Sequence, residues 1–202
     1  MADYPHVLDF NNTILAVTGQ TTDLSVAGRT SKDDGNTQRG EPRNYTLLTA
    51  GQYSGTTNIT VNAKTDAHTN NVVVDNLKQI MWSRSDSASV GPASDGKLYF
   101  DNTATNNEDI FNYCDAANTA SLAGHTDWVI PNIFELFSLM VYQGSAPFIN
   151  SNFTSIASDF YWSSTTRPDN TALGMVASFG VTTISAGAKT SATYYCLLMR
   201  KL

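Results

Sequence analysis

The sequence predicts a mixed α+β fold with small antiparallel sheets and two short helices, preceded by an extended N-terminal arm. Three observations lead to this prediction. Charged residues make up only 15% of the 202-residue chain, whereas a soluble domain usually has about a quarter. The polar positions are filled instead by Asn, Thr, Ser and Gly, which favour turns and strands over long helices. Apolar residues recur with the period of a strand in several segments and with the period of a helix in two.

The chain divides near residue 56 into an arm and one folded domain. Two short apolar runs between His6 and Val17 are followed by a polar stretch from Gly19 to Gly40 that has no periodicity. We therefore interpret residues 1–56 as an arm that attaches the protein to a partner. The hydrophobic fraction of 41% is enough for one core but, at this length, not for two. Residues 57–202 are expected to form a single domain.

Short strands account for most of the expected domain. Residues 57–63 alternate between apolar and polar side chains, which is typical of a half-buried strand. Two β-prone runs, Val72–Val74 and Ile80–Trp82, flank turn-forming residues and predict a hairpin with a five-residue connection. Further strands are predicted at residues 97–100, 160–164, 175–179, 181–185 and 194–199.

The first helix is predicted after a run of polar residues. Asn106 or Asn107 can serve as the N-cap, which would place Glu108 and Asp109 in the first helical turn. Gly124 is expected to end this helix. Its apolar face consists of Ile110, Tyr113, Cys114 and Ala117.

The second helix is predicted directly after Pro131. Asn132 can cap it, and Glu135 stands at the position from which a side chain can bond back to the cap. The cap and the apolar stripe together make this the clearest helix in the sequence. The stripe consists of Ile133, Leu136, Phe137 and Met140.

Charge and hydropathy argue against two classes of partner. The net charge is −6 and no cluster of Lys and Arg offsets it, so a phosphate backbone would be repelled and no nucleic acid is expected. No apolar run approaches the roughly 20 residues needed to cross a bilayer, so we expect no membrane insertion. The acidic start of the sequence does not resemble a signal peptide, and the chain is expected to be made and kept in the cytosol.

No catalytic constellation is visible in the sequence. The metalloprotease, hydrolase, phosphate-loop and dinucleotide motifs are all absent. His6, His68 and His125 share no metal-ligand spacing, and Asp33–Asp34 is better explained as a solvated turn than as a cation site. We therefore expect no catalytic residues, no metal and no cofactor, and the protein is not expected to be an enzyme.

The sequence contains only two cysteines, Cys114 and Cys196. Two are too few for a disulfide framework or for a zinc site made of cysteines alone. Cys114 is interpreted as a small core residue on a helix face. Whether it bonds to Cys196 is left open.

An ordered series of five short motifs covers the last two thirds of the chain. The segments are Asp75–Asn76 with Met81–Trp82, Tyr113–Cys114, Gly124–Asn132 leading into Glu135–Leu136, Tyr161–Thr165, and Met199–Arg200. Together they resemble the Lcl C-terminal domain family, which is named after a collagen-like bacterial adhesin. The resemblance covers about residues 57–202, and five segments in the right order are far more specific than any one of them.

The sequence also departs from the family pattern at three places. Val129 stands where the family usually has Arg, and Leu77–Ile80 replaces a Thr-Gly-Leu step. Cys196 lies two residues earlier than the usual closing cysteine. These departures leave the family-type disulfide open.

The resemblance implies a C-type-lectin-like fold, in which loops on a small sheet display a changeable binding face. Trp82, Trp128 and Trp162 are then expected to be core residues. The binding face would be formed by residues 165–171 and 186–191, which are polar and rich in turn formers. The candidate ligand-binding residues are Thr165, Thr166, Arg167, Asp169, Asn170, Thr171, Lys189, Thr190 and Ser191.

These observations favour a bacteriophage virion surface protein whose domain binds a host-surface glycan or protein. An adhesive domain without an export signal is reconciled with an extracellular role if it assembles onto a virion in the host cytoplasm and is released by lysis. The arm would bind other virion proteins, and a homo-oligomer is expected. Two alternatives stay open: a structural protein that decorates or cements a capsid, and a bacterial surface adhesin.

Overall fold

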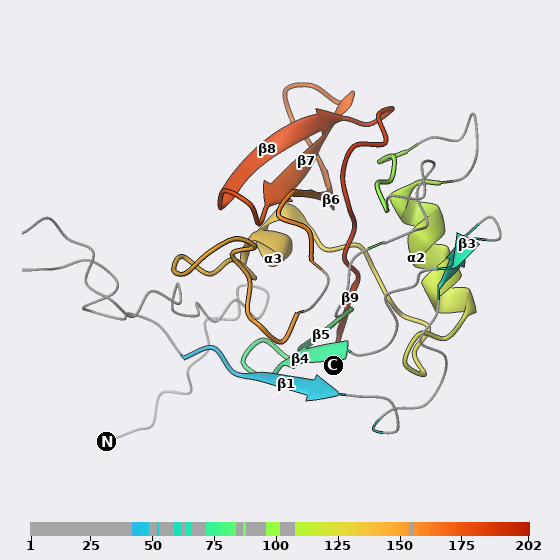
Figure 1. Cartoon of the computed structure of the whole chain (residues 1–202). Helices are drawn as coiled ribbons and strands as arrows, with labels where there is room; N and C mark the ends of the chain where they lie inside the picture. Colours follow the sequence, from blue (N-terminus) through green and yellow to red (C-terminus); the bar gives the residue numbers. More distant parts are fainter. Residues whose placement is uncertain are drawn as a thin grey trace, which may run out of the picture.

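The computed structural model describes residues 42–48, 52, 59–61, 64–65, 72–83, 87, 96–101, 108–153 and 156–202. Two antiparallel sheets and two short helices are the main regular elements of this part of the chain, which confirms the predicted α+β class (Figure 1). A ribbon of two-residue strands, β2 (Thr60–Val61) and β3 (Lys64–Thr65), adds a third small sheet. Of the strand predicted at residues 57–63, the described residues form a strand at Thr60–Val61.

The four-stranded sheet is built around the predicted hairpin. β4 (Val72–Asp75) and β5 (Ile80–Ser83) pair antiparallel, with Val74 opposite Met81. The strand order is β1-β4-β5-β9, so β1 (Tyr45–Leu48) and β9 (Met199–Lys201) form the two edges. The sheet thus joins the first and the last described strands of the chain.

The three-stranded sheet has the order β6-β7-β8, with β6 at Phe160–Thr166, β7 at Leu173–Ser178 and β8 at Thr183–Ala188. The prediction for residues 181–185 was wrong at its start. Val181 is exposed and lies in the turn between β7 and β8, and Thr182 has a positive φ of 49°. A strand cannot include that backbone conformation.

The strand predicted at residues 194–199 was also wrong, because regular pairing begins only at Met199. The backbone N–H of Cys196 donates to the Ser87 hydroxyl, and that of Leu198 donates to the Ser83 hydroxyl. Side chains thus bind these backbone groups in place of a neighbouring strand. The predicted strand at 97–100 is reduced to isolated bridges at Leu98 and Tyr99.

Helix α2 (Ile110–Thr119) begins later than the sequence predicted. Its N-cap is Asp109, whose carboxylate accepts hydrogen bonds from the backbone N–H groups of Phe111 and Asn112. The predicted cap at Asn106 or Asn107, with Glu108 and Asp109 inside the first turn, was therefore wrong. The physical reason is a long-range backbone pairing. The Tyr99 N–H donates to the carbonyl of Glu108, and the Tyr99 carbonyl accepts from the N–H of Ile110.

The end of α2 also differs from the prediction, because the helix stops at Thr119 and not at Gly124. Ser121 and Ala123 adopt positive φ angles of 53° and 51°, so the chain has already left the helix before the glycine. The predicted apolar face is confirmed, since its members are all buried: Ile110, Tyr113, Cys114 and Ala117.

Helix α3 (Ile133–Phe137) has the predicted reciprocal cap. The Asn132 side chain accepts from the N–H of Glu135, and the Glu135 carboxylate accepts from the N–H of Asn132. The helix is only five residues long, so Met140 is buried as expected but lies beyond its end.

The strands of the four-stranded sheet divide their side chains between two cores. Because successive side chains point to opposite faces, Val72 and Val74 enter one core, whereas Val73 enters the other. The buried face of α2 closes the first core, and Ile133 and Leu136 of α3 close the second. The central strands β4 and β5 are consequently buried at every position.

The three tryptophans are fully buried, as the family resemblance implied. Trp128 and Trp162 belong to the first core, and Trp82 belongs to the second. A replacement of any of them would leave a large cavity in a closed core.

Cys114 and Cys196 are both buried and no disulfide joins them, which answers the question that the sequence left open. The Cys114 thiol donates to the carbonyl of Trp128, and that of Cys196 donates to the carbonyl of Leu197. Burial raises the pKa of Cys114 to about 11, and a thiol with so high a pKa is a poor nucleophile at neutral pH.

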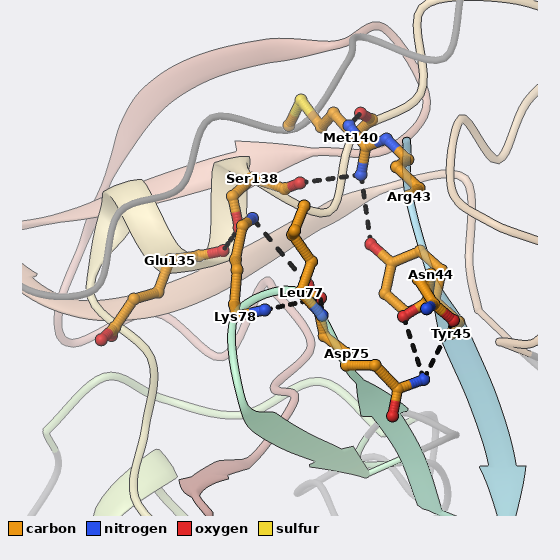
Figure 2. Close-up of polar contacts among 10 residues, drawn as sticks. Arg43, Asn44, Tyr45, Asp75, Leu77, Lys78, Glu135, Ser138 and Met140 are labelled. Atoms are coloured by element: carbon orange, nitrogen blue, oxygen red, sulfur yellow. Dashed lines mark hydrogen bonds and ion pairs between the residues drawn. The ribbon is translucent and has the colours of Figure 1, made fainter. Parts of the chain in front are cut away.

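The segment Arg43–Leu48 lies within the predicted arm, yet it is built into the sheet. Strand β1 pairs with β4 from Tyr45 opposite Asp75 to Leu48 opposite Val72. The Arg43 guanidinium donates to the Tyr45 hydroxyl and to the carbonyls of Ser138 and Met140, beyond the end of α3 (Figure 2). Residues 43–48 therefore connect the four-stranded sheet to α3. The earlier part of the predicted arm, residues 1–41, lies outside the described residues.

A second polar cluster holds the tip of the β4–β5 hairpin. The buried Asp75 carboxylate accepts from the N–H groups of Leu77 and Lys78, and the Lys78 ammonium lies 4.0 Å from it (Figure 2). Burial lowers the pKa of Lys78, and the Asp75 charge offsets part of this change. The Asn76 amide donates to the side chains of Asn44 and Thr46, so the hairpin tip also binds the start of β1.

Replacing Arg43 should destabilise the whole domain, although Arg43 precedes residues 57–202, the domain that the sequence predicted. Arg43→Ala removes charge-assisted bonds and leaves the carbonyls of Ser138 and Met140 without this donor, so we expect a loss of about 2 kcal/mol in the free energy of unfolding. Arg167→Ala is the control, because its side chain is 42% exposed and bonds only locally. Urea unfolding of both variants gives the comparison, and equal stability of the two would contradict the role of Arg43.

Candidate binding face

Two glycines create room for a tryptophan at one end of the three-stranded sheet. Gly174 of β7 lies directly opposite Gly187 of β8. A Cβ at Gly174 would come within 2.5 Å of the Phe100 ring, and a Cβ at Gly187 would overlap the Tyr194 ring. Either Cβ would also lie 3.0 Å from the Trp162 indole. No other residue type fits at these two positions without displacing a ring.

Four aromatic side chains pack in the space that the glycines leave. The Trp162 ring centroid lies 4.9 Å from that of Tyr194 and 5.5 Å from that of Phe100, both in edge-to-face geometry. The indole N–H donates to the carbonyl of Leu98 at 2.8 Å. Phe111 of α2 continues the cluster, with its ring 5.5 Å from that of Phe100. This packing fixes the base on which the loops lie.

Lys189 connects the two predicted loop segments above this base. Its ammonium lies 4.6 Å from the centre of the Phe100 ring and donates to the Thr166 hydroxyl at 2.8 Å. The Lys189 N–H donates to the carbonyl of Ala172, and its carbonyl accepts from the N–H of Phe100. The end of β6, the start of β7 and the turn after β8 thus meet at one place, beside the segment 97–101 and the start of α2 (Figure 1).

The turn between β6 and β7 is closed by its main chain. The N–H of Arg167 donates to the carbonyl of Leu173, and the N–H of Leu173 donates to the carbonyl of Asn170. The Arg167 guanidinium forms two hydrogen bonds with the Asp169 carboxylate, at 2.6 and 2.8 Å. These bonds lower the pKa of Asp169 and raise that of Arg167. Because the pair is exposed, it adds little stability, and the turn is held by its main-chain hydrogen bonds.

The predicted binding residues fall into three groups by their surroundings. Asp169, Asn170, Thr171 and Thr190 are exposed. Thr166, Arg167, Lys189 and Ser191 are partly buried at the base of the same face. Thr165 has a different role, because its hydroxyl accepts from the N–H of Ile133 at the start of α3. Nothing in the local sequence indicated this contact.

The model of the Lcl C-terminal domain family matches residues 71–200, which is well over half of the chain. The chain belongs to the Lcl C-terminal domain family. This confirms the resemblance that the ordered motifs indicated. Comparison with curated proteins and with solved structures returned no match.

The structure explains why the Lcl C-terminal domain motifs occur together. The closing Arg200 donates two hydrogen bonds to Asp127, which directly precedes Trp128. The Asn118 side chain donates to the Trp128 carbonyl and accepts from its N–H, which ties α2 to the same segment. Segments that are far apart in the sequence are therefore in direct contact. This is a packing role. It lies apart from the loop face, which consists of residues 165–171 and 186–191 with the adjoining Asp101 and Phe111.

Two residues of the loop face were missed by the sequence analysis. Asp101 is exposed, and its N–H donates to the carbonyl of Lys189. Phe111 is 42% exposed although it is a large aromatic residue. The sequence held a signal for Phe111, because the residue lies off the apolar stripe of α2.

The described residues show no metal centre. Among them, no group of three or more His, Cys, Asp or Glu side chains is arranged to hold a metal ion. No helix in the described part of the chain is long and apolar enough to span a membrane.

The fit around the paired glycines gives a direct test of how the face is built. Gly187→Ala should lower the free energy of unfolding by roughly 1–3 kcal/mol, because the added methyl group overlaps the Tyr194 ring in a tightly packed cluster. Ser185→Ala, on the same strand but exposed, should change stability by less than about 0.5 kcal/mol. Thermal unfolding of both variants is the measurement. If Gly187→Ala were as stable as the wild type, the described packing would be wrong.

Proposed function

We propose that this chain is a non-enzymatic attachment module that binds a surface through the loop face. The observation that carries the proposal is the way in which the loops are held. Backbone hydrogen bonds close both loops and join them to residues 100–101, while the side chains of Asp169, Asn170, Thr171 and Thr190 extend into solvent. The face can therefore vary in chemistry while its shape stays fixed.

This arrangement suits recognition better than catalysis. Binding residues commonly lie on loops that a rigid scaffold positions. Exposed substitutions away from special backbone positions usually change stability by less than about 0.5 kcal/mol. The exposed residues of the face carry hydroxyl, amide and carboxylate groups, which are suited to a polar ligand. No nucleophile paired with a base is part of this described face, so the chemistry that it supports is binding.

The finer proposal is that the module has a C-type-lectin-like fold and works on a bacteriophage virion. In this proposal the residues before β1 bind other virion proteins, the protein forms homo-oligomers, and the loop face binds a host-surface glycan or protein. The layout of the domain supports such a division. Strand β1 lies at the opposite side of the domain from the loop face (Figure 1). A domain held on the β1 side would present its loops outward.

A charge-matched pair of double variants tests the proposed function. Arg167→Ala with Asp169→Ala removes one positive and one negative side chain from the loop face. Asp115→Ala with Lys201→Ala does the same at exposed positions elsewhere. Both proteins should unfold within about 0.5 kcal/mol of the wild type. Only the loop variant should lose attachment to a panel of intact bacterial strains, by tenfold or more in apparent affinity.

The same variants separate the alternatives. If the loop variant attaches to cells as well as the control does, the loop face is not the attachment surface. If purified particles lose the protein when the loop pair is changed, while their attachment to cells is unaffected, the module is a capsid decoration protein. If the chain mediates attachment when it is displayed on a bacterial cell surface but not when it is carried on a particle, the bacterial surface adhesin is the favoured alternative.

A further inference from the structure

Phe111 extends the loop face with an apolar surface that the predicted binding residues lack. Its side chain is 42% exposed, and its ring meets the Phe100 ring edge to face at an interplanar angle of 84°. Phe111 follows the N-cap Asp109 and donates its N–H to that carboxylate, so both its backbone and its ring are held in place. A fixed aromatic ring binds a ligand at a low cost in conformational entropy.

The basic side chains of the loop face already have partners within the protein. Arg167 pairs with Asp169, and the Lys189 ammonium is held by the Thr166 hydroxyl and the Phe100 ring. The loop face has as many acidic as basic side chains, since Asp101 and Asp169 balance Arg167 and Lys189. The whole chain carries a net charge of −6. An anionic ligand would have to break internal contacts and approach a negative protein.

The remaining groups of the face are neutral donors and acceptors. Thr171 and Thr190 contribute exposed hydroxyls. Asn170 contributes the NH₂ group of its amide, because its side-chain oxygen accepts from the N–H of Ala172. A binding site that combines one aromatic surface with a few well-placed polar groups is the usual form for a small organic ligand. A sugar ring matches this combination, because it has C–H groups on one face and hydroxyls around its rim.

We propose that Phe111, together with the hydroxyl and amide groups of the two loops, forms a subsite for an uncharged sugar unit of a surface glycan. The sugar packs its C–H face on the Phe111 ring and exchanges hydrogen bonds with the loops. This inference rests on the proposed attachment function and specifies its ligand class. It assigns the main contact to a residue of α2 and not to the loops alone.

The test measures binding of the full chain to immobilised dextran and mannan, which are uncharged, and to heparin, which is strongly anionic. We expect binding to at least one uncharged polysaccharide. Its affinity should change little when the NaCl concentration is raised about tenfold, from about 0.05 to about 0.5 M, because no charge on the ligand is screened. Phe111→Leu keeps an apolar side chain but loses the ring, and it should weaken this binding by about tenfold. Phe111→Trp should retain it. Val181→Ala, an exposed apolar position at the other end of the sheet, should have no effect.

A second measurement uses the bacterial strains to which the wild type attaches. Mild periodate cleaves the vicinal diols of sugars and should abolish attachment, whereas protease treatment of the cells should not. Attachment that survives periodate, binding to heparin alone, or equal binding by Phe111→Leu and the wild type would each overturn the inference while leaving the attachment function in place. If the wild type binds no strain and no polysaccharide, the proposed function itself is wrong.

Discussion

The packing of the Trp162 indole against two opposed glycines is the contact on which the rest of the candidate binding face depends. Gly174 and Gly187 leave the sheet surface without side chains at the point where the indole lies, and Phe100 and Tyr194 close around it. Lys189 then lies on the Phe100 ring and bonds to the end of β6. The buried aromatic cluster therefore positions the base of the loops, whereas Asp169 and Asn170 make only local contacts within the β6–β7 turn.

Local sequence patterns predicted those elements whose determinants are themselves local. The β4–β5 hairpin follows from two β-prone runs around a turn, and both strands lie where they were expected. Because Asp75 pairs with Ile80, the connection is one residue shorter than predicted. The start of α3 follows from Asn132 and Glu135, which satisfy each other's backbone groups within four residues. The ordered motifs predicted the family, because the contacts between them preserve their order and type. The two loop segments were also predicted, and the structure brings them together through Lys189 and Thr166.

Elements that depend on distant partners could not be predicted in the same way. Helix α2 begins at Ile110 because Tyr99 pairs with the residues before it, and this pairing is invisible in the local sequence. Strand β1 lies in a stretch that looks like an arm, but it pairs with β4, and Arg43 before it bonds to the carbonyls beyond α3. Thr165 was expected to bind a ligand, but its hydroxyl is occupied by the N–H of Ile133. In each case the residue type was compatible with several roles, and a tertiary contact determined which of them the residue has.

The central claim is that the shape of the loop face is independent of its exposed side chains. The most direct measurement is saturation mutagenesis of the face and its base, read as resistance to proteolysis and therefore as the free energy of unfolding. The account predicts that nearly all substitutions at Asp169, Thr171 and Thr190 are tolerated, whereas nearly none are tolerated at Gly174 and Gly187. If the exposed loop positions proved as intolerant as the two glycines, the side chains would be holding the fold, and the account would be contradicted.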